Sequence, residues 1–244
     1  MISIIIPILN EAKSIGNLLF HLIEQATQQH RFEIIIVDGG SSDGSQDIVS
    51  EFISGRLQSR SNKDLSDNVT VSLIPSEKGR AKQMNLGAKK AIGHILYFLH
   101  ADSFPPKNYD QLIINEVNKG NQAGCFRLQF DSNHWWLRLA SWLTQFSWRA
   151  CRGGDQSLFI TNALFKDIGG YDEDYIIYED NMLINELYKR KQFIVINKKI
   201  QTSSRLYEKH GVWKLQYHFW SIYVKKWFGA SADDLYLYYK KHIS

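Results

Sequence analysis

The stretch ILYFLHADSFPP, residues 95–106, joins an apolar run directly to a histidine and a carboxylate. Residues 95–100 have the length and composition of a buried β-strand. His100 ends the run, Asp102 follows, and two prolines close the segment. Ligands of open parallel sheets bind beyond the carboxyl ends of the strands. Asp102 is therefore a candidate ligand-binding residue, with capping of a helix after the prolines as the alternative.

The same alternation of strand and helix precedes this stretch. Strands are expected at residues 2–6, 32–38 and 69–74, and helices at residues 12–28, 43–54 and 80–92. Asp43 is expected to cap the second helix, with Gln46 as its capping-box partner. The polar residues 54–68 are expected to form an exposed excursion. The alternation predicts an α/β fold in which helices flank a mostly parallel sheet with right-handed crossovers.

The second half of the chain is less regular. Strands are expected at residues 124–130 and 157–160, helices at residues 132–148 and 179–190, and two helical segments at the end. Acidic residues open the helix at 179–190, where they suit the positive end of its dipole. We expect residues 1–204 to form one domain. Residues 205–244 would form a helical C-terminal appendage that packs on this domain or serves as an interface.

Composition and charge exclude several classes of protein. Of the 244 residues, 44% are hydrophobic, as in a globular protein. Two cysteines make neither a disulfide framework nor a zinc cluster, which favours a cytoplasmic protein. Neither a signal peptide nor a membrane-spanning helix is expected from the apolar runs. Residues 205–244 contain 7 Lys and Arg against 3 Asp and Glu, which is too mild a bias for nucleic-acid binding.

Polar side chains follow each strand expected in the first half. The candidate nucleotide-binding residues are Pro7, Asn10, Glu11, Asp38, Arg80 and Lys82. Each one alone has an ordinary explanation as part of a turn, a cap or a solvated face. Their shared position at one edge of the sheet favours a ligand site.

This mixture of charges suits a nucleoside diphosphate. Acidic side chains suit ribose hydroxyls and base N–H groups, and basic side chains suit phosphate. A carboxylate that faces a diphosphate needs a divalent cation between them, and Mg²⁺ is often held this way. Asp102 is therefore expected to bind Mg²⁺ or Mn²⁺. The first turn lacks the G-x-G-x-x-G pattern, so a dinucleotide-dependent dehydrogenase is disfavoured, and no Walker A sequence is present.

Five segments between residues 2 and 190 together resemble the family 2 glycosyltransferases with the GT-A fold. They are ISIIIPILNE, IIIVDGGSSDGS, KGRAKQMNLGAKKA, LYFLHADS and GGYDEDYIIYEDNMLINELYKR. The blocks GRAKQMN, HAD and GGDQS resemble a bacterial subgroup associated with radical-SAM and selenium-related gene clusters. The resemblance implies an inverting, metal-dependent transfer of a sugar from a UDP or GDP donor to an unidentified acceptor hydroxyl.

The resemblance also implies roles for individual residues. Pro7 and Glu11 would line the base and ribose pocket, and Asp38 would contact the base. Asp102 matches the last aspartate of the D-x-D metal motif. Asp180 matches the catalytic base, which takes the proton of the acceptor hydroxyl.

The sequence departs from the family pattern at two positions, and three further residues are candidates for the expected site. Gly39 stands where many relatives have a second acid, and His100 stands where they have the first aspartate of D-x-D. A site with one carboxylate is expected to bind metal more weakly than a site with two. Asp155, Glu179 and Arg205 are candidates for contact with the donor sugar or the acceptor.

The C-terminal region is rich in tryptophan. Trp213, Trp220 and Trp227 are spaced by seven residues and share one face of a helix. This face is expected to pack against the chain's own domain. Docking at a membrane interface and a homodimer contact are the alternatives.

Three functions remain open at this point. The first is the soluble, cytoplasmic glycosyltransferase. The second is a non-catalytic protein that binds a nucleotide sugar, which the presence of Asp102 and Asp180 disfavours. The third is a transferase that acts on a lipid acceptor, peripheral on the inner face of the membrane.

Overall fold

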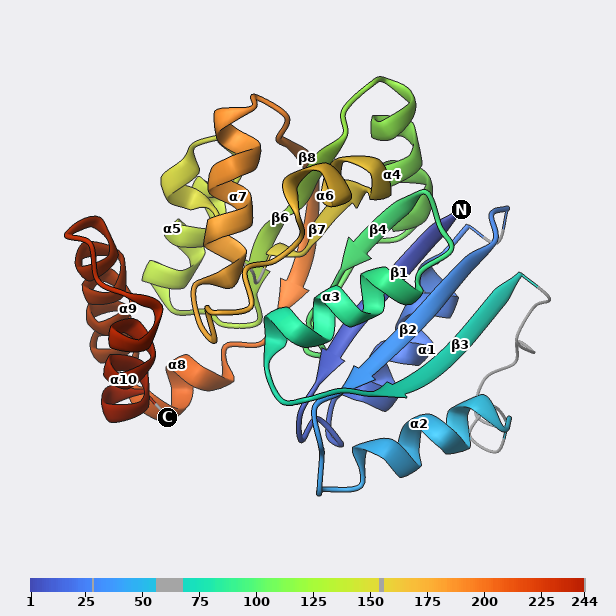
Figure 1. Cartoon of the computed structure of the whole chain (residues 1–244), viewed down its shortest axis with the longest axis horizontal. Coiled ribbons are helices and arrows are strands. Elements are labelled where there is room, and N and C mark those ends of the chain that lie inside the picture. Colours follow the sequence, from blue (N-terminus) through green and yellow to red (C-terminus); the bar gives the residue numbers. More distant parts are fainter. Residues whose placement is uncertain (28, 56–67, 154–155, 244) are drawn as a thin grey trace.

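The computed structural model describes residues 1–27, 29–55, 68–153 and 156–243. Within these residues, one sheet has the strand order β3-β2-β1-β4-β7-β6-β8-β5 (Figure 1). The strands are β1 (Ile2–Ile8), β2 (Phe32–Asp38), β3 (Val69–Pro75), β4 (Ile95–Phe98), β5 (Ser103–Phe104), β6 (Ala123–Phe130), β7 (Leu158–Thr161) and β8 (Ile194–Thr202).

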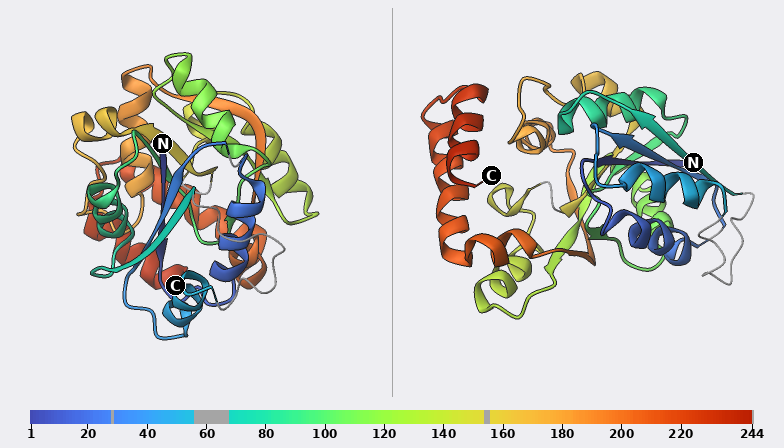
Figure 2. Two further views of the ribbon diagram at one scale, coloured as in Figure 1. Left: turned by 90° about the vertical axis from the view of Figure 1, so that its right-hand side faces the viewer. Right: turned by 90° about the horizontal axis from the view of Figure 1, so that it is seen from below.

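Helices lie on both faces of the sheet (Figures 1 and 2). They are α1 (Ile15–Gln25), α2 (Ser45–Ile53), α3 (Arg80–Lys90), α4 (Tyr109–Asn118), α5 (Trp135–Leu143), α6 (Asn162–Ile168), α7 (Glu179–Lys189), α8 (Arg205–His210), α9 (Val212–Trp227) and α10 (Ala232–His242). A short 3₁₀ turn, η2, spans Arg149–Cys151. Helices α1, α2 and α4 share one core, and α3, α6 and α7 share the other.

The parallel half of the sheet confirms the expectation from the sequence. Strand β1 pairs in parallel with β2 and β4, and β2 pairs in parallel with β3. Ile4 and Ile6 pack into one core, and Ile5 packs into the other. A strand covered on both faces reads as a continuous apolar run, which is why β1 is visible in the sequence.

The second half of the sheet is mixed. Strand β7 is antiparallel to both β4 and β6, while β8 is parallel to β6 with an irregularity at Phe126 and Arg127. The strands β5 and β8 were not expected from the sequence. Strand β8 has exposed residues at its centre, so its sequence, IVINKKIQT, shows no clear apolar pattern.

The expected and observed helices differ most in two regions. The aromatic helix expected at 132–148 covers only Trp135–Leu143. Beyond it, the Thr144 hydroxyl donates to the Ser141 carbonyl and accepts from the Leu128 amide, which fixes a turn against β6. The end of the chain has three described helices instead of two, because Gly211, at φ 83°, separates α8 from α9.

The C-terminal helices pack through a small apolar cluster of their own. Leu215 and Ile222 of α9 meet Leu235 and Ile243 from the α10 region, and Tyr175 joins them from the segment before α7. Helices α9 and α10 lie side by side at the end of the molecule away from β3 (Figures 1 and 2). No described helix is both long enough and apolar enough to cross a bilayer.

Candidate active site

The candidate site lies where β1, β2 and β4 end, as the sequence predicts. Asp38 is the last residue of β2, and its side chain is buried. Its carboxylate accepts hydrogen bonds from the amides of Gly40 and Ser41, and from Nε2 of Gln46 at 2.6 Å. Both carboxylate oxygens are therefore engaged within the loop that Asp38 begins.

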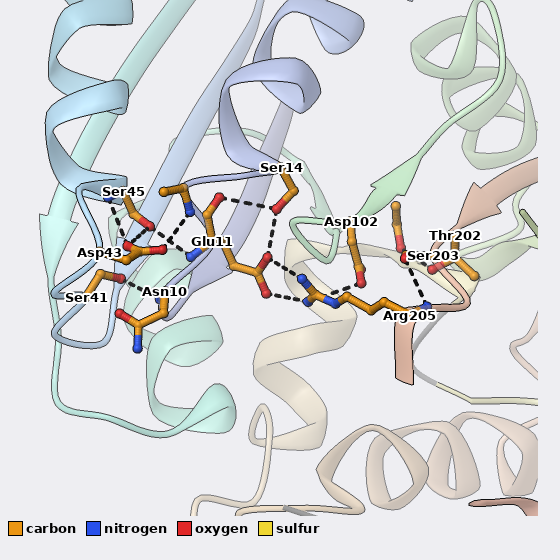
Figure 3. Close-up of polar contacts among 12 residues, drawn as sticks. Asn10, Glu11, Ser14, Ser41, Asp43, Ser45, Asp102, Thr202, Ser203 and Arg205 are labelled. Atoms are coloured by element: carbon orange, nitrogen blue, oxygen red, sulfur yellow. Dashed lines mark hydrogen bonds and ion pairs between the residues drawn. The ribbon is translucent and has the colours of Figure 1, made fainter. Parts of the chain in front are cut away.

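Asn10 and Asp43 tie the loops after β1 and β2 together (Figure 3). Asn10 has a left-handed backbone, at φ 58°, and its Oδ1 accepts from the Ser42 amide at 2.9 Å. Asp43 accepts from the Ala12 amide at 2.9 Å and from Ser45. These bonds hold the loops in a fixed relation, so both residues shape the site.

The predicted capping box at α2 is wrong. Gly44 occupies the N-cap position, and Asp43 precedes it. Gln46 turns toward Asp38 because a buried carboxylate is a stronger acceptor than an exposed loop can offer. The Gln46 amide was missed as part of the site, since an uncharged side chain on a helix carries no sequence signal.

A second amide, that of Gln83 in α3, was also missed. Gln83 is buried, and its Nε2 donates to the carbonyls of Ile8 and Val37 at 2.8 and 2.7 Å. A Cβ atom added to Gly39 would lie 3.0 Å from Oε1 of Gln83. Gln83 thus fills the space in which an acidic side chain at position 39 would begin, which gives a physical reason for glycine there.

Glu11 and Asp102 share one arginine (Figure 3). Arg205, the first residue of α8, donates to both carboxylate oxygens of Glu11 at 2.9 and 2.5 Å. Its Nη2 lies 3.3 Å from Oδ2 of Asp102. Ser14 also donates to Glu11, at 2.7 Å. Half of the Arg205 side chain is exposed, so solvent or a ligand can reach it.

Asp180 belongs to a second charged group. Oδ2 of Asp180 lies 3.7 Å from Nη1 of Arg80 and 3.9 Å from Nε2 of His100. The same Nη1 of Arg80 lies 3.2 Å from Oε1 of Glu179. Arg80 opens α3, whereas Glu179 and Asp180 open α7. The structure therefore places Arg80 beside the expected base.

Glu179 is the most buried member of this group, with a side chain only 1% exposed. Burial raises the pKa of Glu179 to about 7, although the Arg80 guanidinium opposes this shift. The neighbouring Asp180 adds to the rise. In this structure the enclosed Glu179 side chain pairs with Arg80, and its contact with the donor sugar or the acceptor stays a prediction.

The HAD segment connects the two charged groups. His100 approaches Asp180, and Asp102 approaches Arg205. The amide of Ser103 donates to the His100 carbonyl at 3.1 Å, so these residues form a tight turn after β4. His100, which stands at the first position of the D-x-D motif, therefore faces the expected base through its Nε2.

The remaining candidates lie elsewhere. Lys82 pairs with Glu77 at 2.5 Å, and the structure does not bring it to either charged group. Pro7 lies within β1, in register with Val37. Asp155 falls outside the described residues.

The donor set around Asp102 fits a metal ion that shares its coordination with a diphosphate. No group of three or more His, Cys, Asp or Glu side chains in the described part of the chain is arranged to hold a metal. Mg²⁺ commonly takes one or two carboxylates and completes its shell with phosphate oxygens and water. Asp102 can be that carboxylate, once the guanidinium of Arg205 moves away from it.

Comparison with known families gives one match that covers most of the chain. The family described as glycosyl transferase family 2 matches residues 3–171. The undecaprenyl-phosphate 4-deoxy-4-formamido-L-arabinose transferase of Pseudomonas syringae pv. syringae is 34% identical over 115 residues, which are 46% of this chain and 31% of that protein. The chain spans about a third of the length of the curated relatives that match it most strongly.

Solved structures share the fold. S. aureus TarS 1–349 in complex with UDP superposes with a TM-score of 0.65 at 20% identity, over 83% of this chain and 60% of that one. The mannosyltransferase PcManGT from Pyrobaculum calidifontis, in complex with GDP-Man and Mn²⁺, gives a TM-score of 0.60 at 19% identity, over 91% of this chain and 59% of that one.

Proposed function

The chain belongs to glycosyl transferase family 2 and has the GT-A fold, and on this basis we propose that it transfers a sugar from a nucleoside-diphosphate donor to an acceptor hydroxyl, with inversion and with a divalent metal ion. One observation carries the proposal. The turn after β4 lies against both charged groups, through His100 at Asp180 and Asp102 at Arg205. A single short turn thus connects the expected base to the expected metal ligand.

Asp180 is proposed to take the proton of the acceptor hydroxyl. Its side chain is 12% exposed, so one edge is open to a ligand. It lies in the first turn of α7 beside Arg80 and His100, which hold the carboxylate in place. A carboxylate positioned against the acceptor hydroxyl can take its proton as a general base.

The opposite end of the site would hold the diphosphate. Asp102 is the residue that would hold Mg²⁺ or Mn²⁺, and the metal would supply the positive charge that neutralises the departing diphosphate. Arg205 is proposed to exchange its bonds to Glu11 for bonds to phosphate, since guanidinium binds both groups in the same two-pronged way. Glu11 would then be open to a ribose hydroxyl.

The comparisons support the choice of donor and metal. The superposed structures hold UDP in one case, and GDP-Man with Mn²⁺ in the other. We further propose membership of the subgroup associated with radical-SAM and selenium-related gene clusters. The blocks that resemble it, GRAKQMN and HAD, supply Arg80, His100 and Asp102 to the two charged groups.

A lipid acceptor is the second candidate for the reaction. Several relatives are named as transferases that act on undecaprenyl phosphate. In this chain, helix α9 contacts the first turn of α7, where Asp180 lies, through a hydrogen bond of 3.4 Å from the Tyr223 hydroxyl to Oδ1 of Asn181. An acceptor that arrives along α9 would therefore reach the proposed base.

The test of the proposal is a panel of UDP- and GDP-sugars, in which release of the nucleoside diphosphate is followed with and without Mn²⁺. One donor should be consumed only when the metal is present. Calorimetry should show that the metal tightens binding of the matching nucleoside diphosphate, and that Asp102→Asn removes this gain. Asp233→Asn, an exposed aspartate of α10, is the charge-matched control and should retain the gain.

Two results would count against this function. Metal-dependent binding of the nucleotide without any turnover would favour the non-catalytic binding protein. Equal nucleotide affinity with and without the metal would remove Asp102 from metal binding.

A further inference from the structure

Helix α9 turns large apolar side chains away from the core. Leu215 and Ile222 are its buried residues. Trp213 and Trp220 are about half exposed, and Trp227 at the end of the helix is 85% exposed. The expectation that this tryptophan face packs against the chain's own domain therefore holds only in part, because one side of each ring remains open to solvent.

Helix α5 extends the same surface. Trp135 and Trp142 are more than half exposed, and the ring of Trp135 lies 5.6 Å from that of Trp213. Trp136 bridges the helices beneath them, at 5.4 Å from Trp213 and 5.8 Å from Trp220. We name this the α5–α9 aromatic surface, and it consists of Trp135, Trp142, Trp213, Trp220, Trp227 and Phe228.

The charges on these two helices have one sign. Neither α5 nor α9 contains an acidic residue. Arg138, Lys214 and Lys225 are exposed on them. At 100° per residue, Arg138 lies within about 60° of Trp135 and Trp142 on α5, whereas Lys214 and Lys225 lie about 100° or more around α9 from its tryptophans. Lys225 also lies over the Tyr238 ring of α10, at 5.0 Å from its centroid. Tryptophan together with basic residues is typical of protein surfaces that lie in the headgroup layer of a membrane.

The acidic residue Asp234 of α10 lies close to α9, and its pKa is lowered by the Ser231 hydroxyl and also by Lys225 of α9. Asp233 and Asp234 lie in the first turn of α10, where they suit the helix dipole. Asp234 is further engaged by Ser231 in a capping box. Lys240 and Lys241 add positive charge at the other end of α10.

We propose that the α5–α9 aromatic surface docks on an anionic lipid bilayer. The indole rings would enter the headgroup layer, and the lysines would meet lipid phosphate, where each contributes on the order of 1 kcal/mol. A symmetric dimer suits the surface less well. A two-fold contact places the same patch on both sides, so it would bring the lysines of one copy toward those of the other.

Docking would also place the candidate active site close to the membrane. The Tyr223 ring of α9 lies 5.4 Å from the ring of Tyr178, which directly precedes Glu179 and Asp180. This consequence rests on the proposed transferase function, in which Asp180 is the base. It identifies the acceptor as a lipid-linked group presented at the bilayer surface.

The experiment is co-sedimentation of the full chain with vesicles. Vesicles of phosphatidylcholine with phosphatidylglycerol should bind the protein, and vesicles of phosphatidylcholine alone should bind it much less. High salt should weaken binding to the anionic vesicles. The double variant Trp227→Ala and Phe228→Ala should bind at least about tenfold more weakly, because two large apolar side chains no longer enter the interface. Both side chains are over 80% exposed, so the fold should survive.

The control variant is Ile92→Ala, which removes an exposed apolar side chain between α3 and β4. It should bind vesicles as the wild type does. Lack of sedimentation at low salt, or equal binding by the double variant, would overturn the proposal. So would a dimer in analytical ultracentrifugation that the double variant abolishes, because the surface would then join two copies. These readouts need no turnover, so docking and transferase activity can fail separately.

Discussion

Asp38 and Asp180 both lie at the edge of the sheet, yet they are held in opposite ways. Asp38 is held by amides of its own loop and of the next helix, all within eight residues. Asp180 is held by Arg80 and His100, which come from segments far away in the sequence. Glu11 and Asp102 resemble Asp180 in this respect, since both meet Arg205.

The difference separates carboxylates that build the site from carboxylates that can react in it. The buried carboxylate of Asp38 cannot leave its donors without losing hydrogen bonds that solvent does not fully replace, which costs free energy. A carboxylate held by a partly exposed arginine can exchange that partner for a metal ion at little cost. We therefore expect Asp38 to act mainly through structure, and Asp102 and Asp180 mainly through chemistry.

The largest effect is expected for Asp180→Asn. The variant keeps the size of the side chain but cannot take the proton of the acceptor, so turnover should fall by about 10²- to 10⁴-fold. Affinity for the donor should barely change. Turnover and donor affinity should be measured on the same preparation, with Asp174→Asn as an exposed control on the preceding loop. Turnover within a few-fold of the wild type would exclude Asp180 as the base, and lost donor binding would make it structural.

The second effect concerns the pH dependence of stability and distinguishes Glu179 from its neighbour. Burial raises the pKa of Glu179 from 4.5 to about 7. Its contribution to stability is therefore fully present below about pH 4.5, and it is lost as the pH rises through 7. The Glu179→Gln variant has no carboxyl group to ionise at this position, so it does not lose this stability as the pH rises. Between about pH 4 and pH 8, the free energy of unfolding of the variant should therefore rise relative to that of the wild type by up to about 3 kcal/mol.

Urea unfolding across that pH range measures this difference. Glu77→Gln is the control, because the pKa of the exposed Glu77 is lowered by Lys82 and its effect has the opposite sign. A difference between Glu179→Gln and the wild type that does not vary with pH would show that Glu179 is charged in the folded protein.

The smallest effect is the difference in stability cost between replacing Asp38 and replacing Asp102. Asp38→Asn leaves one acceptor oxygen where three N–H groups converge, so it should destabilise the fold by about 1–3 kcal/mol. Asp102→Asn weakens the pairing with a half-exposed arginine, and it should cost less than about 1 kcal/mol. Urea unfolding of the two variants at one pH provides the comparison. Equal costs would mean that the two kinds of carboxylate do not differ.

The burial of an element decides whether its strand or helix can be recognised in the sequence. Strands covered on both faces, such as β1 and β2, are apolar throughout and were predicted closely. Strand β8 has three consecutive exposed residues at its centre, Asn197, Lys198 and Lys199, and β5 has only two residues, so neither strand has a readable pattern. In the candidate site, the acids that follow the strands carry a sequence signal, whereas the amides of Gln46 and Gln83 were not expected because they carry no charge.

The sequence by itself determined which carboxylates reach the edge of the sheet, because parallel strands end together and the acids follow the strands directly. Tertiary structure alone decided which cation each carboxylate meets. Arg80 was expected at a phosphate, and in this structure it pairs with Glu179, 99 residues later in the chain. Arg205 reaches Glu11 across 194 residues. Such pairings depend on how the helices pack against the sheet, and no local pattern of residues encodes that packing.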